Sequence, residues 1–225
     1  MRSSQFNRPA LVRQLAGWLP VSAEATAPRQ DIAERLGEWL NVADAIALKA
    51  VHQALPAVGR APRRADALPE ARQAELEAEL QRVRDTLSRS ITTPPVPAVQ
   101  AEDTLFTPYH KRCQDQQRRM EMSIDALRGH LRQTLSAASP RLAQLATLDA
   151  TLDQMLGGRE QRLLAGLPAL LKQRFQQQRQ AHPETWPALF EHDFQQALLA
   201  ELEHRLQPVL GMIEALAEAS RTEPN

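Results

Sequence analysis

The stretch from Ser139 to Ser220 constrains the fold more than any other part of this chain. Its leucines recur at spacings of three and four residues, beginning with Leu142 and Leu145. Because that spacing places side chains on one face of an α-helix, the stretch predicts amphipathic helices whose leucine faces are buried. Pro140 favours a helix start, since a proline is tolerated in the first turn and the preceding serine can cap it.

Two interruptions are expected in this stretch. The pair Gly157-Gly158 can take the left-handed conformation that ends a helix, so we expect the chain to turn there. A second hinge is expected at His182-Pro183. Apolar residues then resume over 186–213 at nearly heptad spacing, which predicts the longest helix of the chain. Pro208 is expected to kink or break that helix near Arg205.

The remaining composition agrees with a helical protein. Aromatic residues make up only 4% of the 225 residues, so burial must come mainly from leucine and alanine on helix faces. A chain of this length can bury a sizeable core. The sequence therefore predicts an all-α fold, a multi-helix bundle of about six or seven amphipathic helices with a long C-terminal helical hairpin.

Two stretches containing proline divide the N-terminal half. Their composition disfavours helix and buries little apolar surface. We predict one domain overall with five parts, an N-terminal helical segment (1–53), a linker (54–68), a charged helix (69–91), a Pro-rich linker (92–107) and a main helical bundle (108–220).

The N-terminal segment is expected to contain two helices. A short amphipathic helix opens at Pro9, with Leu11, Leu15 and Trp18 on one side, and a longer one covers 30–48. The apolar side of the short helix suits packing on the core, although it would serve equally as a docking helix, and arginines beside it are compatible with a membrane surface. Core packing is the favoured interpretation.

A seam of apolar residues on the long C-terminal helix is the candidate partner-binding surface. We predict that it forms a homodimer, because it is longer than a compact monomer easily covers. The competing account is that the helix from Gly158 to Gln180 folds back antiparallel and covers the seam within one chain. The seam consists of Trp186, Phe190, Phe194, Leu198, Leu202 and Leu206.

An arginine stripe on the helix that follows Pro108 is the candidate contact for nucleic acid or another anion. Acidic residues interleave with the stripe, and the chain has 27 basic and 27 acidic residues, so it lacks the positive field typical of nucleic-acid-binding proteins. Regulatory nucleic-acid binding is therefore kept only as the alternative function. The stripe comprises Arg112, Arg118, Arg119, Arg128 and Arg132.

No pattern in the sequence indicates catalysis. Glu201 and His204 have the spacing found in di-iron bundles, but no second copy matches, so both are interpreted as surface polar residues. His110 and Cys113 put an imidazole near a thiol through local spacing alone. Phosphate loops, nucleophile elbows and paired cysteine motifs are missing from the sequence. We predict a non-enzymatic protein without catalytic, cofactor-binding or metal-binding residues.

Cysteine content and hydropathy bear on location. The single cysteine, Cys113, suits a reducing compartment. No apolar run approaches the roughly 20 residues that cross a bilayer. The sequence therefore predicts a cytoplasmic protein without a membrane span.

Three blocks of sequence carry a resemblance to a known family. They are 31–40 with 44–46, 156–160 with 163–164, and 198–202 with 205–209. With these blocks the chain resembles the proteobacterial family called domain of unknown function 3348. That family has no assigned activity, so the resemblance implies no catalytic residues. Its members are encoded near OmpA-like envelope proteins and membrane proteins with long coiled coils. Amphipathic helices without a convergent polar site predict a helical adaptor or accessory subunit that mediates protein–protein contacts, and the resemblance implies a place in a cell-envelope-associated assembly.

Overall fold

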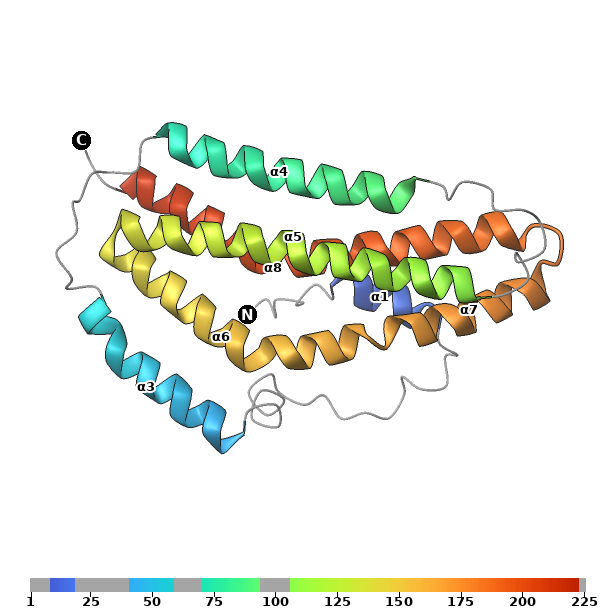
Figure 1. The fold of residues 1–225 in the computed structure, drawn as a ribbon, viewed down its shortest axis with the longest axis horizontal. Helices are drawn as coiled ribbons and strands as arrows, with labels where there is room; N and C mark the ends of the chain where they lie inside the picture. Colours follow the sequence, from blue (N-terminus) through green and yellow to red (C-terminus); the bar gives the residue numbers. More distant parts are fainter. Residues whose placement is uncertain (1–8, 19–40, 59–69, 94–105, 223–225) are drawn as a thin grey trace, which may run out of the picture. The chain divides into compact units, whose positions relative to one another are not determined.

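The computed structural model describes residues 9–18, 41–58, 70–93 and 106–222 of the chain (Figure 1). Every regular element in these ranges is an α-helix, which confirms the predicted all-α, multi-helix fold. The helices are α1 (Ala10–Ala16), α3 (Val42–Val58), α4 (Glu70–Thr92), α5 (Thr107–Ala138), α6 (Pro140–Leu164), α7 (Leu167–Ala181) and α8 (Trp186–Thr222).

The chain divides into two compact units, and each draws on three separate stretches of sequence. Unit 1 comprises Met1–Val21, Gln81–Ile124 and Arg162–Gln207, and unit 2 comprises Ser22–Leu80, Asp125–Gln161 and Pro208–Asn225. Helices α4, α5, α6 and α8 therefore each supply a segment to both units. The single domain expected from the sequence stays a prediction.

In unit 1, α7 and the first half of α8 form an antiparallel hairpin (Figure 1). The Phe175 ring lies with its centroid 5.0 Å from that of Trp186 and 5.2 Å from that of Phe190. On the same hairpin the Arg174 guanidinium pairs with Asp193 at 2.6 Å. The hinge predicted at His182-Pro183 is present, since α7 ends at Ala181 and α8 begins at Trp186.

The apolar seam of α8 is buried within one chain, against α7 and also against α5, whose Tyr109 ring lies 5.7 Å from the Phe194 ring. Trp186 is half-buried, and the other five seam residues have no exposed surface. The structure therefore has the fold-back arrangement, and the seam is core rather than an exposed partner surface. The five buried residues are Phe190, Phe194, Leu198, Leu202 and Leu206.

The break between α6 and α7 does not lie where the sequence suggested. Gly157-Gly158 is inside α6, and no glycine in the described residues has a positive φ angle, so the predicted turn at this pair is wrong. The helix ends instead at Leu164. The residue four positions on, Pro168, has no N–H to donate to the Leu164 carbonyl, so the helical hydrogen bond is missing there. A proline, rather than glycine flexibility, ends α6.

Two other predicted boundaries also change. Helix α8 continues past Pro208 to Thr222, so the break considered near Arg205 is not observed. Helix α3 includes Pro56 and ends at Val58, which makes the first part of the predicted linker 54–68 helical. The rest of that linker and most of both the predicted 30–48 helix and the 92–107 linker lie outside the described residues.

Candidate functional site

The start of α3 in unit 2 is fixed by a reciprocal cap. The Asn41 side-chain oxygen accepts a hydrogen bond from the Asp44 N–H at 2.8 Å, and Asp44 Oδ2 accepts one from the Asn41 N–H at 2.9 Å. The two side chains thus satisfy backbone donors that the first turn of a helix leaves without partners.

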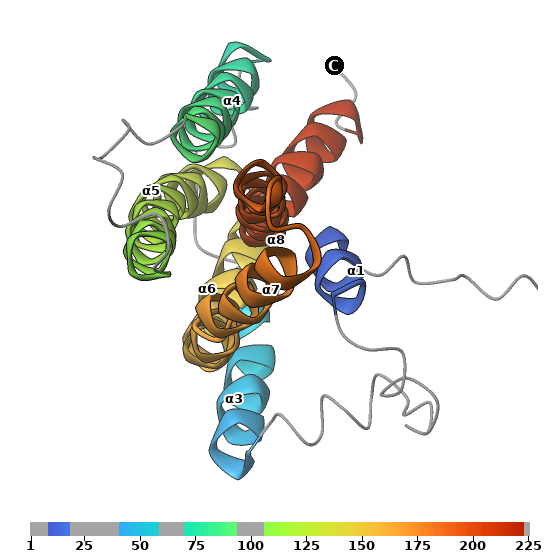
Figure 2. The same ribbon diagram turned by 90° about the vertical axis from the view of Figure 1, so that its right-hand side faces the viewer.

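Two further polar contacts attach α3 to α6, which runs beside it in unit 2 (Figures 1 and 2). Arg159 Nη2 pairs with Asp44 Oδ2 at 2.8 Å, and Gln144 Nε2 donates to the Leu55 carbonyl at 2.9 Å. None of the α3 residues is fully buried, although most of them are apolar. One side of α3, which carries Ala47, Leu48, Val51 and Leu55, is half-buried, and the opposite side leaves much apolar surface uncovered.

The uncovered surface of α3 has a consistent side, which we call the outer face of α3. Val42 is 77% exposed and Ile46 is 63% exposed, and the alanines of the face are exposed as well. At about 100° per residue, these positions fall within roughly a third of the helix circumference. The apolar residues of the face are Val42, Ala43, Ile46, Ala50, Ala54 and Ala57, and the exposed Gln53 lies among them. Clustered exposed apolar side chains of this kind mark contact sites for other proteins.

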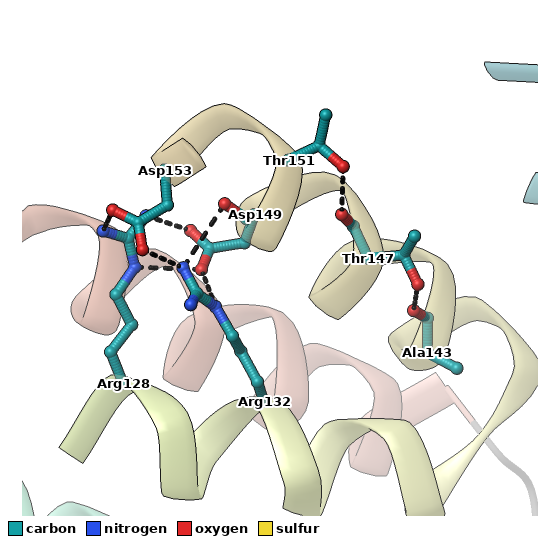
Figure 3. A network of polar contacts seen from close by, with 7 residues as sticks. All are labelled: Arg128, Arg132, Ala143, Thr147, Asp149, Thr151 and Asp153. Carbon is teal, nitrogen blue, oxygen red and sulfur yellow. Dashed lines mark hydrogen bonds and ion pairs between the residues drawn. The ribbon is translucent and has the colours of Figure 1, made fainter. Parts of the chain in front are cut away.

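Two residues of the arginine stripe form a network with α6 in unit 2 (Figure 3). Arg128 Nη2 lies 2.7 Å from Asp149 Oδ1, and Arg132 Nε lies 2.6 Å from Asp149 Oδ2. Both arginines also pair with Asp153, at 2.8 and 2.9 Å. Two guanidiniums therefore face two carboxylates, and their positive charge is balanced inside unit 2.

The other three arginines of the stripe belong to unit 1. Arg112 donates to both carboxylate oxygens of Glu191 at 2.8 Å, and its guanidinium lies 4.8 Å from the centroid of the Phe194 ring. Arg119 donates to the Ser90 hydroxyl at 3.2 Å, and Arg118 is exposed. Together with the unit 2 network, these contacts leave few stripe residues to bind phosphate.

An open groove with a volume of about 650 Å³ follows α5 and α6 in unit 2. The hydroxyls of Thr147 and Thr151 donate to carbonyls of their own helix at 2.8 and 2.9 Å (Figure 3). Arg132 is the charged residue of the lining, and its guanidinium is held by aspartates. The groove is lined by Arg132, Gln133, Ser136, Ala137, Ala146, Thr147, Ala150, Thr151 and Gln154.

A buried carboxylate lies in unit 1. Glu201 has no exposed surface and pairs with Arg205, whose Nη2 lies 2.8 Å from Oε1. Gln117 Nε2 donates to both Glu201 oxygens, at 3.2 and 3.1 Å, and to the Leu164 carbonyl at 3.0 Å. Gln117 thus supplies the donor that Pro168 lacks. Burial raises the pKa of Glu201, while the charge of Arg205 and the hydrogen bond from Gln117 act in the opposite direction.

The interpretation of Glu201 as a surface polar residue is wrong, because its side chain is fully buried. His204 is half-buried. Sequence reasoning missed the buried carboxylate because a glutamate on a helix is usually solvated. Arg205 was the available signal. It stands four residues after Glu201 on a helix side flanked by Leu198 and Leu202, where a lone carboxylate would be costly to bury.

The thiol near His110 is not an activated nucleophile. Cys113 has no exposed surface, and burial together with the negative charge of Glu201 raises the pKa of the thiol to about 12. The thiolate needed for nucleophilic attack is therefore scarce at neutral pH. The Tyr109 ring packs into the aromatic cluster, 4.8 Å from the Phe190 ring.

The described residues also bear on metal binding and membrane insertion. No three His, Cys, Asp or Glu side chains in these ranges gather closely enough to hold a metal ion. The described helices also lack any segment with both the length and the apolar character needed to cross a membrane.

Comparison with known proteins places the chain in a family. No curated protein matches it, and no solved structure does. A family model matches residues 1–218, which is nearly the whole sequence. The chain therefore belongs to the family described as protein of unknown function DUF3348.

Proposed function

We propose that the protein is a non-enzymatic adaptor or accessory subunit that binds a partner protein through the outer face of α3. The observation that carries this proposal is the exposure of Val42 (77%) and Ile46 (63%), two large apolar side chains one helical turn apart on the same side of α3. They lie on a helix that contains no fully buried residue. Contact with a partner would remove this apolar surface from water, which is the main favourable contribution to protein association.

The composition of the outer face indicates the kind of partner. Burying a large apolar side chain contributes about 1.5–3 kcal/mol, and the face offers Val42 and Ile46 for this purpose. The alanines beside them allow another backbone to approach closely. Lys49 and His52 are exposed on the flank of the face and provide a polar rim. This arrangement suits an apolar groove or a second amphipathic helix, as in helix-in-groove recognition.

The proposed place of action follows from the sequence. A single cysteine is compatible with the reducing cytoplasm, and the family resemblance implies neighbours in the cell envelope. We therefore propose a cytoplasmic subunit of a cell-envelope-associated assembly.

Recovery of the partner from native membranes tests the proposal. The test variant is Val42→Glu/Ile46→Glu, and the matched control is Met122→Glu/Leu189→Glu, which puts the same charges on exposed apolar positions of other helices. The wild type and the control should recover the same envelope protein after crosslinking, and the test variant should lose it. All three chains should keep the same helical circular dichroism. Equal recovery by the test variant would contradict the proposal.

Sedimentation distinguishes a foreign partner from a second copy of the chain. The homodimer expected from the sequence cannot use the buried seam, so the outer face of α3 is the surface to test. A wild-type dimer at about 100 μM that becomes a monomer in Val42→Glu/Ile46→Glu would identify a second copy as the occupant. A monomeric wild type that still recovers an envelope protein identifies a foreign one.

A further inference from the structure

Helix α1 lies beside α7 and α8 in unit 1 (Figure 2). Leu11 packs with Leu164 of α6 and Ala200 of α8, and all three are buried, while Leu15 packs against this cluster. We call the surface of α6, α7 and α8 beneath α1 the α1 seat.

Two polar contacts extend the α1 seat. The Gln14 amide, oriented for hydrogen bonding, donates to the Gln196 carbonyl at 3.1 Å and accepts from the Ala197 N–H at 3.2 Å. After the helix, the Trp18 ring lies beneath the Arg174 guanidinium, 5.8 Å from the ring centroid. The seat therefore recognises two leucines four residues apart, an amide between them and an aromatic ring three residues after the second leucine.

Helix α1 is poorly stabilised outside this seat. It has seven residues, and its N-terminal flank, Pro9, provides no side-chain hydrogen bond. Isolated helices shorter than about 12 residues are marginal in water, so α1 depends on docking for its helical structure. Val12 on its other side is 47% exposed. Short elements with so few buried contacts belong to the parts of a protein that open at low free energy.

We propose that α1 is a displaceable strap, and that the α1 seat docks an amphipathic helix of a partner protein with this pattern of leucines and aromatic ring. Helix α1 already occupies the seat, so its residues indicate which side chains a partner helix needs. A partner must compete with a ligand on the same chain, whose effective concentration is higher than that of a weak ligand free in solution. The strap therefore keeps the seat closed to weak ligands. This inference concerns a second surface and does not depend on the outer face of α3.

An NMR titration of the full-length chain tests the strap. The probe is a synthetic peptide of residues 9–18, and the readout is the shift of the Leu164 and Ala200 amide signals. In Leu11→Glu/Leu15→Glu the strap is undocked, and the peptide should bind about tenfold or more tightly than to the wild type, because the competing ligand is gone. The matched control, Val12→Glu, adds charge to the outward side of α1 and should behave as the wild type.

Three results would overturn the proposal. Loss of helical circular dichroism beyond α1 in Leu11→Glu/Leu15→Glu would show that α1 is part of the essential core. Equal peptide affinity for this variant and the wild type, or shifts that persist after Ala200→Arg is added, would show that the seat is not the binding site. Binding of the peptide to phosphatidylglycerol vesicles, with no shifts at the seat, would identify α1 as a membrane-surface helix.

Discussion

Glu201 and Arg205 lie one turn apart on α8 and form an ion pair in which the carboxylate has no exposed surface and the arginine side chain is 13% exposed. The pair lies on α8 next to Leu198 and Leu202 of the buried seam. Removing one partner from such a pair is more damaging than never having had it, because the other charge stays buried without compensation.

The first prediction concerns the cost of leaving Glu201 alone. Arg205→Ala should lower the free energy of unfolding by about 3–5 kcal/mol, the range observed when one partner of a buried ion pair is removed. Urea unfolding followed by circular dichroism measures this change. Arg118→Ala is the control, since an exposed arginine on α5 should change stability by less than about 0.5 kcal/mol. Equal effects of the two substitutions would show that the pair contributes no more than surface charges do.

The second prediction concerns pH. Burial raises the pKa of Glu201 in the folded chain, so the folded state binds its proton more tightly than the unfolded state. The stability from this group is complete below about pH 4.3, the ordinary pKa of glutamate, and is lost as pH rises through the folded value. Compared with Glu201→Gln, the wild type should lose stability as pH increases over this window. Urea midpoints measured across pH 4.5–8 check this. Parallel curves for the two chains would contradict it.

The third prediction separates core from surface on α8. Leu198 has no exposed surface, so Leu198→Glu should unfold the chain rather than give a folded monomer, because an unpaired buried carboxylate costs several kcal/mol. Leu189→Glu introduces the same charge on the same helix at a position that is 40% exposed and should keep full helicity. Circular dichroism and sedimentation read both outcomes. A folded Leu198→Glu chain would show that position 198 is not part of the core.

The fourth prediction uses the lone thiol as a probe. Cys113 is buried and the pKa of its thiol is raised to about 12, so a disulfide reagent should react very slowly with the folded chain at pH 8. The same reagent should react at once in denaturing urea, which serves as the control. Rapid labelling without urea would show that this part of unit 1 opens often.

Leucine periodicity was enough to predict the helices, because burial of one face is the main stabiliser of a helix in a protein. The positions at which helices end were harder to predict. Gly157-Gly158 can end a helix, but glycine also tolerates helical angles, and here it takes them. Pro168 was the better signal, because a missing N–H cannot be compensated within the helix.

The sequence alone could not show which apolar helix faces are exposed. Apolar spacing shows which side of a helix can be buried, and the seam of α8 and the side chains of α3 look alike in this respect. Only packing shows that α7 covers Phe190 while Ile46 stays exposed. The charges of the arginine stripe were visible in the sequence, but their partners Asp149 and Glu191 come from distant positions.

The Leu164 carbonyl links the end of α6 to the buried carboxylate. Because Pro168 cannot donate to this carbonyl, Gln117 does, and the same amide also serves Glu201. Pro168→Ala would restore a backbone donor and allow α6 and α7 to join, so Gln117 would lose one of its two acceptors. Positions 117, 168 and 201 should therefore behave as an epistatic group during evolution. A change at one of them should be tolerated only in chains that have already changed at another.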